Sequence, residues 1–458
     1  MTAPALVWFR DDLRISDHPA LSSAAKSGRP VLAVYVLDEE TERPLGGAAR
    51  WWLAGSLESL AADLGSAGVP LVLRRGRADA AIAALVRESR AAAVHWNRRY
   101  RQAASKLDDA LAAELRREGV AVETHEGDLL FEPAAIRSGS DKPYQMFTPF
   151  WRACIGASPP PRPMPPPAQV TAPAEIPASE RLADWRLRPS APDWAAGLRA
   201  ACTPGERAAR LRLQRFLERG LAEYPRDRDF PAKPATSGLS PHLRWGEISP
   251  REVWHAVEAA GGGAAFLREL GWREFAAHVL WREPDLATRP LRAEFARFPW
   301  RSDARSLKAW QRGRTGYPLV DAGMRELWTT GVMHNRVRMA AASFLVKHLL
   351  LPWQTGEAWF WDTLVDADPA SNAMNWQWVG GCGIDAAPYF RIFNPVLQSR
   401  KFDPEGDYIR RWVPELATLS AREIHLPSAA TAPAYPSPIL EHRAARERAL
   451  AALARTRR

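Results

Sequence analysis

Five short apolar runs stand in the first 130 residues, and amphipathic, Ala-rich segments lie between the later ones. The runs occupy 5–9, 30–37, 70–75, 91–97 and 120–127, and the segments occupy 48–64, 79–89 and 103–118. Apolar strands that alternate with helices are typical of a parallel sheet covered on both faces. The pattern therefore predicts an N-terminal α/β domain over 1–130 with a doubly wound, five-stranded parallel sheet.

From about Glu206 onward the apolar residues recur every three or four positions, which is the period of a helix. Helices are predicted at 207–224, 249–260, 263–282, 317–331, 332–350 and 355–365, with a basic helix from 440 to the end. The pattern predicts a large all-α domain over 206–458. Residues 131–205 would connect the two domains, and the Pro-rich stretch 158–177 would run extended over the surface because proline fits neither helix nor central strand.

The turn after the first apolar run reads WFRDDLRISDHP and contains no Gly-x-Gly-x-x-Gly. Those glycines let a backbone approach a pyrophosphate, so a dinucleotide is not expected in the usual place beside this sheet. Any dinucleotide would have to be held by the helical domain. Locally, the Asp and Arg residues of the turn are interpreted as solvated ion pairs worth ~0–1 kcal/mol.

The stretch 359–402 is unusually rich in interleaved carboxylates, amides and tryptophans, including Asp366, Asn372 and Trp376. An apolar core does not need this mixture, because buried polar groups require partners. Aromatic faces beside hydrogen-bonding groups predict a pocket for a flat, conjugated ligand with polar edges. The ligand could be a cofactor, a nucleobase, or both.

Two further patterns leave alternatives open. Hydroxyls and a glycine in 236–240 precede a helix, which suits either an anion site or an ordinary helix N-cap. Glu269 with Trp272, and Asn335 with Met339, share helix faces at spacings of three and four. Such side chains suit a pyrimidine's polar edge and apolar ring, but interhelical packing would also explain them.

Composition adds limits. Lys and Arg number 62 against 52 Asp and Glu, a net charge of +10 that permits a polyanionic partner. The three cysteines lie far apart and form no metal-type spacing, which suits a reducing compartment, and no metal site is predicted. We find neither a leader pattern nor a membrane-length apolar run, and so expect a soluble, cytoplasmic, monomeric protein.

The order WFRDDLR, TSGLSPHLRWGEISP, LGWREF, TGYPLVDAGMREL, MHNRVRM, DADPASNAMNWQW and DAAPYFRIFNP resembles the photolyase/cryptochrome family over about 5 to 440. Within that family it is most similar to the bacterial deoxyribodipyrimidine photolyases. The resemblance implies a light-driven repair enzyme in which excited reduced FAD donates an electron to a cyclobutane pyrimidine dimer flipped out of UV-damaged DNA.

The resemblance also implies a FAD site in the helical domain. Arg338 and Asp366 would pair over the isoalloxazine, and Asp368 would lie at its polar edge. Asn372 would face the central-ring nitrogen that gains or loses a proton, where a neutral amide stabilises the anionic reduced flavin. The phosphates and ribose would meet Tyr224, Thr236, Ser237, Gly238, Leu239, Ser240 and Arg273.

Substrate and relay residues follow in the same way. Trp272 and Trp378 would stack on the dimer, Glu269 and Asn335 would hydrogen-bond its bases, and Met339 would pack against it. The DNA backbone would be contacted through Arg228, Arg336 and Arg391, with Trp272 and Asn335 at the same interface. Trp376, Trp353 and Trp300 match the family's electron relay from flavin to surface, although three core tryptophans are the alternative.

Departures concern the second, light-harvesting chromophore. The positions that match a folate-type site are Ala103, Ala104 and Ala287, and the acidic residues of a deazaflavin-type site are replaced by Arg99 and Arg101. Neither antenna pocket has its usual residues, so FAD is the cofactor expected, and the sequence leaves open whether a second chromophore, a folate or a deazaflavin, is bound. Gly238 also replaces an arginine of some relatives, which a contact made mainly by backbone would tolerate.

Three other functions compete. A blue-light sensor of the cryptochrome class would share the fold and FAD, but Asn372 is the photolyase choice and no long signalling extension follows. A six-four photoproduct enzyme would have histidines at Asn335 and Met339. A DNA-binding module without catalysis would explain the charge but not the pocket or the tryptophans.

Overall fold

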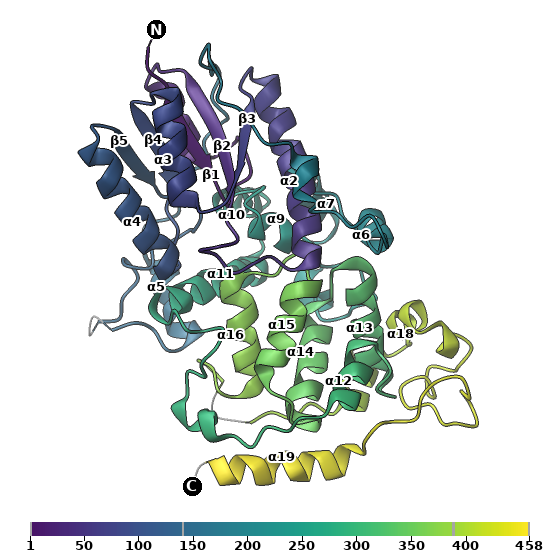
Figure 1. The fold of residues 1–458 in the computed structure, drawn as a ribbon. Helices are drawn as coiled ribbons and strands as arrows, with labels where there is room; N and C mark the ends of the chain where they lie inside the picture. Colours follow the sequence, from purple (N-terminus) through teal and green to yellow (C-terminus); the bar gives the residue numbers. More distant parts are fainter. Residues whose placement is uncertain (1, 140–141, 387–389, 457–458) are drawn as a thin grey trace.

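The computed structural model describes residues 2–139, 142–386 and 390–456. An α/β domain lies above a helical domain in Figure 1. The five strands run parallel in the order β3-β2-β1-β4-β5, as predicted. They are β1 (Ala5–Phe9), β2 (Val31–Leu37), β3 (Leu71–Arg75), β4 (Ala93–Asn97) and β5 (Ala121–His125).

Helices cover both faces of this sheet, which confirms the doubly wound prediction (Figure 1). Val7 and Phe9 point to the face covered by α1 (Pro19–Lys26) and α2 (Gly47–Ser66). Leu6 and Trp8 point to the face covered by α3 (Ala78–Ser89) and α4 (Gln102–Arg117). The apolar pattern alone did not identify α1, because that helix has only 8 residues.

The connector carries short helices and an extended Pro-rich stretch. The helices are α5 (Phe147–Gly156), η1 (Leu182–Trp185) and α6 (Ala196–Ala201). Residues 158–177 contain no helix or strand, in agreement with the prediction. Part of this stretch is nevertheless fixed, because the backbone N–H and carbonyl of Met164 both bond to Asp17. The domain boundaries at 130 and 205 stay predictions.

Among the described residues beyond 205, all regular structure is helical. The elements are α7 (Glu206–Arg219), α8 (Tyr224–Asp227), α9 (Ser240–Arg244), α10 (Pro250–Ala259), α11 (Ala264–Arg282), η2 (Ala293–Arg297), α12 (Ala304–Gln311), α13 (Pro318–Thr330), α14 (Asn335–Ser343), η3 (Phe344–His348), α15 (Trp353–Thr363), α16 (Pro369–Gly380), α17 (Pro395–Phe402), α18 (Asp407–Trp412), η4 (Pro414–Leu416) and α19 (His442–Thr456). None of the described helices is long and apolar enough to cross a membrane.

Two predicted helices have different ends. The helix expected over 207–224 stops at Arg219, and a new short helix begins at Tyr224. The helix expected over 332–350 begins at Asn335 and becomes a π-helical turn at Phe344.

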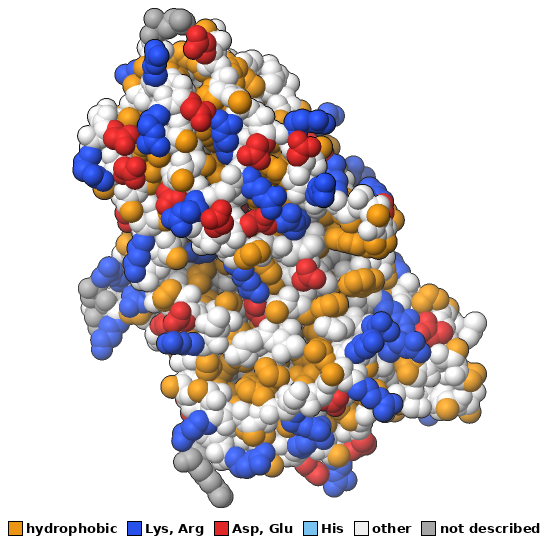
Figure 2. Space-filling model, viewed as in Figure 1, with side chains coloured by type: hydrophobic (Ala, Val, Ile, Leu, Met, Phe, Trp, Pro, Cys, Tyr) orange, Lys and Arg blue, Asp and Glu red, His pale blue; other side chains and the backbone are white. Residues whose placement is uncertain are grey.

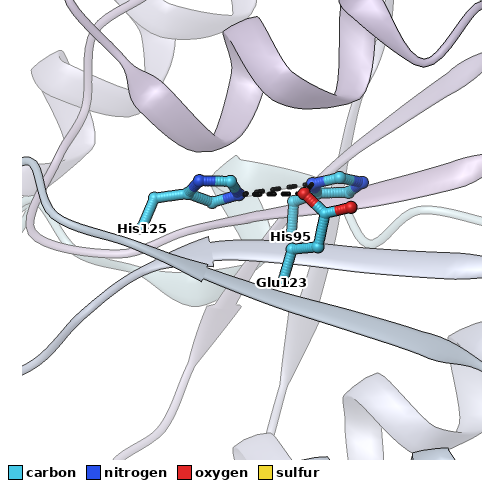
Figure 3. A group of neighbouring side chains, drawn as sticks. All are labelled: His95, Glu123 and His125. Atoms are coloured by element: carbon cyan, nitrogen blue, oxygen red, sulfur yellow. Dashed lines mark hydrogen bonds and ion pairs between the residues drawn. The ribbon is translucent and has the colours of Figure 1, made fainter.

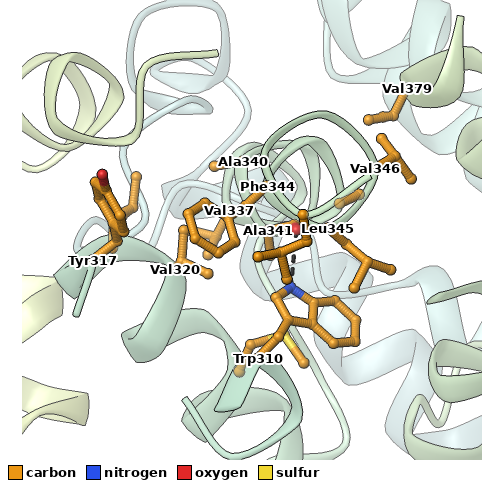
Figure 4. Packing of buried hydrophobic residues seen from close by; sticks show 14 of the residues in the cluster. Trp310, Tyr317, Val320, Val337, Ala340, Ala341, Phe344, Leu345, Val346 and Val379 are labelled. Atoms are coloured by element: carbon orange, nitrogen blue, oxygen red, sulfur yellow. Dashed lines mark hydrogen bonds between the residues drawn. The ribbon is translucent and has the colours of Figure 1, made fainter. Parts of the chain in front are cut away.

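The core of the helical domain is built around buried tryptophans and small residues. Figure 4 shows Trp310 of α12 against Val337, Ala341 and Leu345 of α14 and η3. The Trp310 indole N–H donates to the Ala341 carbonyl at 3.0 Å, so this buried polar atom is satisfied.

The turn after β1 is buried between the two domains, so its interpretation as a solvated turn was wrong. Arg14 is 1% exposed, and its guanidinium donates to the carbonyls of Asp17, Gly127 and Gly246. Asp17 pairs with Arg251 of α10 at 3.0 Å. The turn therefore ties the sheet to the helical domain.

We predict that Arg251→Ala lowers the apparent free energy of unfolding by about 3–5 kcal/mol, because it leaves the Asp17 carboxylate buried without its charge partner. Urea titration followed by tryptophan fluorescence measures the change. The matched control is Arg188→Ala, which breaks an exposed pair with Glu58 and should cost ~0–1 kcal/mol. Equal effects of the two substitutions would contradict the assigned role of the buried pair.

Candidate functional site

Three elements of the helical domain meet at Asp366. Arg338 of α14 donates to both carboxylate oxygens at 3.1 and 2.9 Å. The Ser240 hydroxyl, at the start of α9, donates to the same carboxylate at 2.6 Å. Asp366 is a buried residue, so these two donors satisfy a charge that water reaches poorly. The predicted Arg338–Asp366 pair is therefore present, and the 236–240 loop is attached to it.

Asn372 lies one helical turn beyond Asp368 on α16 and is buried. Its side-chain nitrogen donates to the backbone carbonyl of Glu357 at 3.0 Å and to the Glu357 carboxylate at 2.9 Å. Both partners are oxygen acceptors, so the amide N–H groups must face them. The amide oxygen of Asn372 is then the atom left for a ligand.

Glu357 is itself held by Arg43, at 2.7 and 3.0 Å, on the segment that leads into α2. A residue of the α/β domain thus fixes the rotamer of Asn372 through one intermediate side chain. Sequence reasoning missed Glu357. Its signal was a carboxylate among the many apolar and aromatic residues of α15.

The 236–240 loop turns at Gly238, whose φ is +62°. A Cβ at this position would lie 2.5 Å from a terminal guanidinium nitrogen of Arg212 on α7, which that flexible side chain could relieve by moving, so it is the positive φ that favours glycine. No side-chain N-cap bond begins α9, because the residue at the N-cap is Leu239, whose side chain has no acceptor. Of the two alternatives for this loop, the side-chain cap is the one that the structure does not have.

Arg212 is a second residue that sequence reasoning missed. It stands beside the loop at the glycine that replaces an arginine of some relatives, so a cation from another helix occupies the neighbourhood. Gly238, which stands where some relatives have an arginine, could have indicated that another residue supplies the cation. It could not indicate that this residue is Arg212.

Tyr224 and Arg273 are placed differently from this group. Tyr224 is buried in an aromatic cluster with Phe216 and Phe266. The Arg273 guanidinium donates to the carbonyl of Asp128 at 3.0 Å and to Glu274 at 3.2 Å. None of the described contacts joins Arg273 to the 236–240 loop, so its predicted phosphate role gains no support from this geometry.

Arg273 and Asp368 instead line a cavity of about 90 Å³ between the domains. Asp368 caps α16 by accepting from the backbone N–H groups of Ala370 and Ser371. Burial raises the pKa of Asp128 to about 6, although Arg273 opposes the rise. Burial likewise raises the pKa of Glu274 to about 7.

The predicted substrate residues form a second group, joined by ion pairs. Arg228 donates to Glu269 at 2.5 Å, and the next residue, Asp229, pairs with Arg336 at 2.7 Å. Arg336 in turn approaches the Met339 sulfur at 3.9 Å. Asn335 is exposed at the start of α14. Asp229, which sequence reasoning missed, therefore links the α11 residue to the α14 residues.

The predicted stacking tryptophans lie on α11 and α16. Trp272 stacks on Phe147 of α5, with ring centroids 3.8 Å apart. Trp378 donates to the Asp385 carbonyl at 3.1 Å. It shares a small cavity of about 30 Å³ with exposed Arg391 and with Lys347, whose pKa burial lowers well below its ordinary value. Residues 387–389 of the DAAPYFRIFNP motif lie outside the described residues.

The three relay candidates belong to one apolar cluster and differ in burial. Trp376 is 2% exposed and Trp353 is 1% exposed, whereas Trp300 is partly exposed. Trp376 also meets Phe360 and Trp310 edge-on. The order from buried to partly exposed suits a path outward, but the same packing would suit three core tryptophans.

The antenna positions are occupied by internal contacts. Arg99 donates to Glu42 and Asp108, and Arg101 pairs with Glu42, so the two arginines are neutralised within the domain. Ala104 is buried, while Ala103 and Ala287 offer no polar atom on their side chains. The antenna prediction is neither confirmed nor excluded by these contacts.

Surface charge does not by itself locate the partner. On the face shown in Figure 2, Lys and Arg are interleaved with Asp and Glu over the α/β domain. Orange apolar patches gather over the middle of the helical domain. The two polar groups, and not the net charge, therefore indicate that the protein binds a ligand.

Comparison with known proteins gives the same two parts. Residues 5–168 match the family described as DNA photolyase, and residues 266–455 match the FAD binding domain of DNA photolyase. A deoxyribodipyrimidine photo-lyase of Agrobacterium fabrum is 50% identical over 99% of this chain and 98% of its own length. Cryptochrome-1 of Arabidopsis thaliana is 37% identical over 92% of this chain and 64% of its own length.

The fold is also found in solved structures. The crystal structure of a bacterial class III photolyase from Agrobacterium tumefaciens is similar with a TM-score of 0.96 at 50% identity. The similarity covers 100% of this chain and 98% of that one. The likeness thus includes both domains and the connector.

Proposed function

Because this chain belongs to the DNA photolyase family, we propose that it is a light-driven enzyme that repairs cyclobutane pyrimidine dimers in UV-damaged DNA. The observation that carries the proposal is the group that Ser240 and Arg338 form around the buried carboxylate of Asp366, together with the oriented amide of Asn372. When bound there in its reduced state, FAD supplies the electron that opens the cyclobutane ring after light absorption.

The donor set fits FAD. The Arg338–Asp366 pair presents a fixed, planar cation beside the loop that the family uses for the cofactor. The Asn372 amide oxygen is free to accept a hydrogen bond, and a reduced flavin carries a hydrogen on its central-ring nitrogen. Glu357 is the positioning residue that keeps this oxygen turned toward the ligand, since it binds the amide nitrogen.

The phosphate end of the cofactor would meet the 236–240 loop. We assign Arg212 as the cation that supports the phosphates there, because it lies against Gly238 where some relatives have an arginine. Thr236, Ser237 and Ser240 would contribute hydroxyl and backbone donors. Tyr224 and Asp368 would lie at the edge of the FAD site. The phosphate contact of Arg273 stays a prediction.

The second group would hold the substrate. Trp272 and Trp378 would stack on the flipped-out dimer, and Asn335, Met339 and Glu269 would contact its bases. In this structure Arg228 is bound to Glu269, so a DNA phosphate that attracts Arg228 would release the Glu269 carboxyl toward the bases. Arg336 and Arg391 would complete the backbone contacts.

We also propose that the protein is a monomer and that it is located in the cytoplasm. The three cysteines are free and buried, which suits a reducing compartment.

The decisive experiment is anaerobic illumination of the chemically reduced protein with an oligonucleotide that carries one cyclobutane thymine dimer. We predict intact thymines in the light and none in an identical dark sample. Recovery is measured by chromatography of the digested oligonucleotide. Bound FAD and tight binding to the damaged DNA without repair would overturn the proposal in favour of a light sensor.

We predict that Arg212→Ala raises the Kd for FAD about tenfold or more, because a charge-assisted hydrogen bond to phosphate is worth ~1.5–3 kcal/mol. The change is measured by the FAD fluorescence that appears as the cofactor dissociates during dilution or dialysis. Arg212→Lys should restore part of the affinity. The matched control is Arg207→Ala, an exposed arginine of the same helix. Equal affinities for the two alanine variants would remove Arg212 from the site.

We predict that Trp300→Phe slows photoreduction of the oxidised cofactor by at least tenfold and leaves repair by the chemically reduced enzyme nearly unchanged. Phenylalanine is far harder to oxidise than tryptophan, so only the relay is interrupted. Absorption spectroscopy under illumination measures the first rate and the oligonucleotide assay the second. Trp194→Phe, an exposed tryptophan of the connector, is the control. Parallel loss of both activities would contradict the relay.

A further inference from the structure

A group of His95, Glu123 and His125 lies in the α/β domain, on strands that none of the proposed roles uses. His95 of β4 is the direct partner of Glu123 on β5, and His125 follows Glu123 by two positions, so all three side chains project to one face of the sheet. Figure 3 shows the two imidazoles and the carboxylate turned toward one point. The face is the one covered by α1, whose Ser23 hydroxyl donates to Glu123 at 2.9 Å.

The distances between the two imidazole nitrogens and the carboxylate oxygen are those found between ligands of one tetrahedral metal ion. His95 Nδ1 lies 3.4 Å from His125 Nε2 and 3.4 Å from a Glu123 oxygen, and His125 Nε2 lies 3.7 Å from that oxygen. A tetrahedral ion with bonds of about 2.0–2.2 Å separates its ligand atoms by about 3.3–3.6 Å. The three distances therefore match one triangular face of such a tetrahedron, while the two rings, which are within 9° of parallel with centroids 5.7 Å apart, would have to tilt for both nitrogens to point at one ion.

We propose that His95 Nδ1, His125 Nε2 and a Glu123 carboxylate oxygen bind one divalent transition-metal ion of the Zn²⁺ type. Two imidazoles and a carboxylate suit a borderline ion such as Zn²⁺ and are a poor set for Mg²⁺ or Ca²⁺, which prefer oxygen ligands. A water molecule would complete the tetrahedron, since Glu123 is 51% exposed and opens the group to solvent.

The surroundings help to orient the carboxylate ligand. Ser23 orients the carboxylate from outside the ligand set.

One feature limits the affinity. The Nε2 of His95 is buried and has no hydrogen-bond partner among the described residues, whereas most metal-bound imidazoles donate their second nitrogen to a carboxylate or carbonyl. Loss of such a partner typically costs 10–100-fold in affinity, so we expect binding in the micromolar range rather than the nanomolar range. The ion would tie the edge strand β5 to β4.

Titration of the full-length, FAD-loaded and untagged protein with Zn²⁺ by calorimetry tests the proposal, with Co²⁺ as a spectroscopic probe. We expect one site per chain, a tetrahedral Co²⁺ absorption band, and a higher midpoint of thermal unfolding with Zn²⁺. His125→Ala and Glu123→Gln should each weaken Zn²⁺ binding at least tenfold. Both residues are partly or largely exposed, so these variants should fold, unlike one at buried His95.

The matched control is His255→Ala, a histidine of α10 whose ring contacts carbonyls of the Pro-rich stretch. It should keep the full affinity. Absence of Zn²⁺ binding, an octahedral Co²⁺ spectrum, or equal affinities for His125→Ala and His255→Ala would each overturn the proposal. In that case the three side chains only bond to one another. The repair assay reports separately on the proposed enzyme activity.

Discussion

Burying the charged turn after β1 is the constraint from which the rest of this structure follows. A buried guanidinium must find acceptors, and Arg14 finds them in carbonyls from both domains. Asp11 of the same turn pairs with Arg244 at the end of α9, and Arg244 donates to the Ala367 carbonyl at 2.8 Å. Ala367 stands between Asp366 and Asp368. The domain interface thereby fixes the backbone that presents both carboxylates.

The close approach of the domains also explains a glycine. Gly246 has φ +61°, and a Cβ there would lie against the Asp11 carbonyl. Any larger residue would push the turn away from α9 and disturb the contact between Arg244 and the 365–368 segment. The α/β domain therefore acts on the helical site through backbone placement, and through Arg43 and Glu357 on the orientation of Asn372.

The two polar groups of the helical domain differ in how easily they can rearrange. The Asp366 carboxylate is 4% exposed, so separating it from Arg338, which is 25% exposed, would leave a buried charge without a partner. Arg228 and Glu269 are 25% and 30% exposed, so water can replace either partner at small cost. A fixed pair suits a permanently bound cofactor, and an exchangeable pair suits a substrate that arrives and leaves. The burial of each pair agrees with the role proposed for it.

Sequence pattern was sufficient where the structure depends on local periodicity, and insufficient where it depends on distant partners. The central strands β1 and β2 are continuous apolar runs, and Asn372 and Trp376 share a face of α16 by spacing alone. Arg212 meets Gly238 from another helix, and Arg43 meets Glu357 across 314 positions, so no local pattern could indicate either contact.

The turn at 10–14 was misjudged for the same reason. Its charges look solvated in the sequence, and only the second domain shows that they are covered. At the β5 edge the logic is reversed: the face that α1 covers could have been closed with apolar side chains, yet β4 contributes an imidazole there and β5 an imidazole and a carboxylate. Polar groups gathered where packing does not require them are the feature that also revealed the cofactor site.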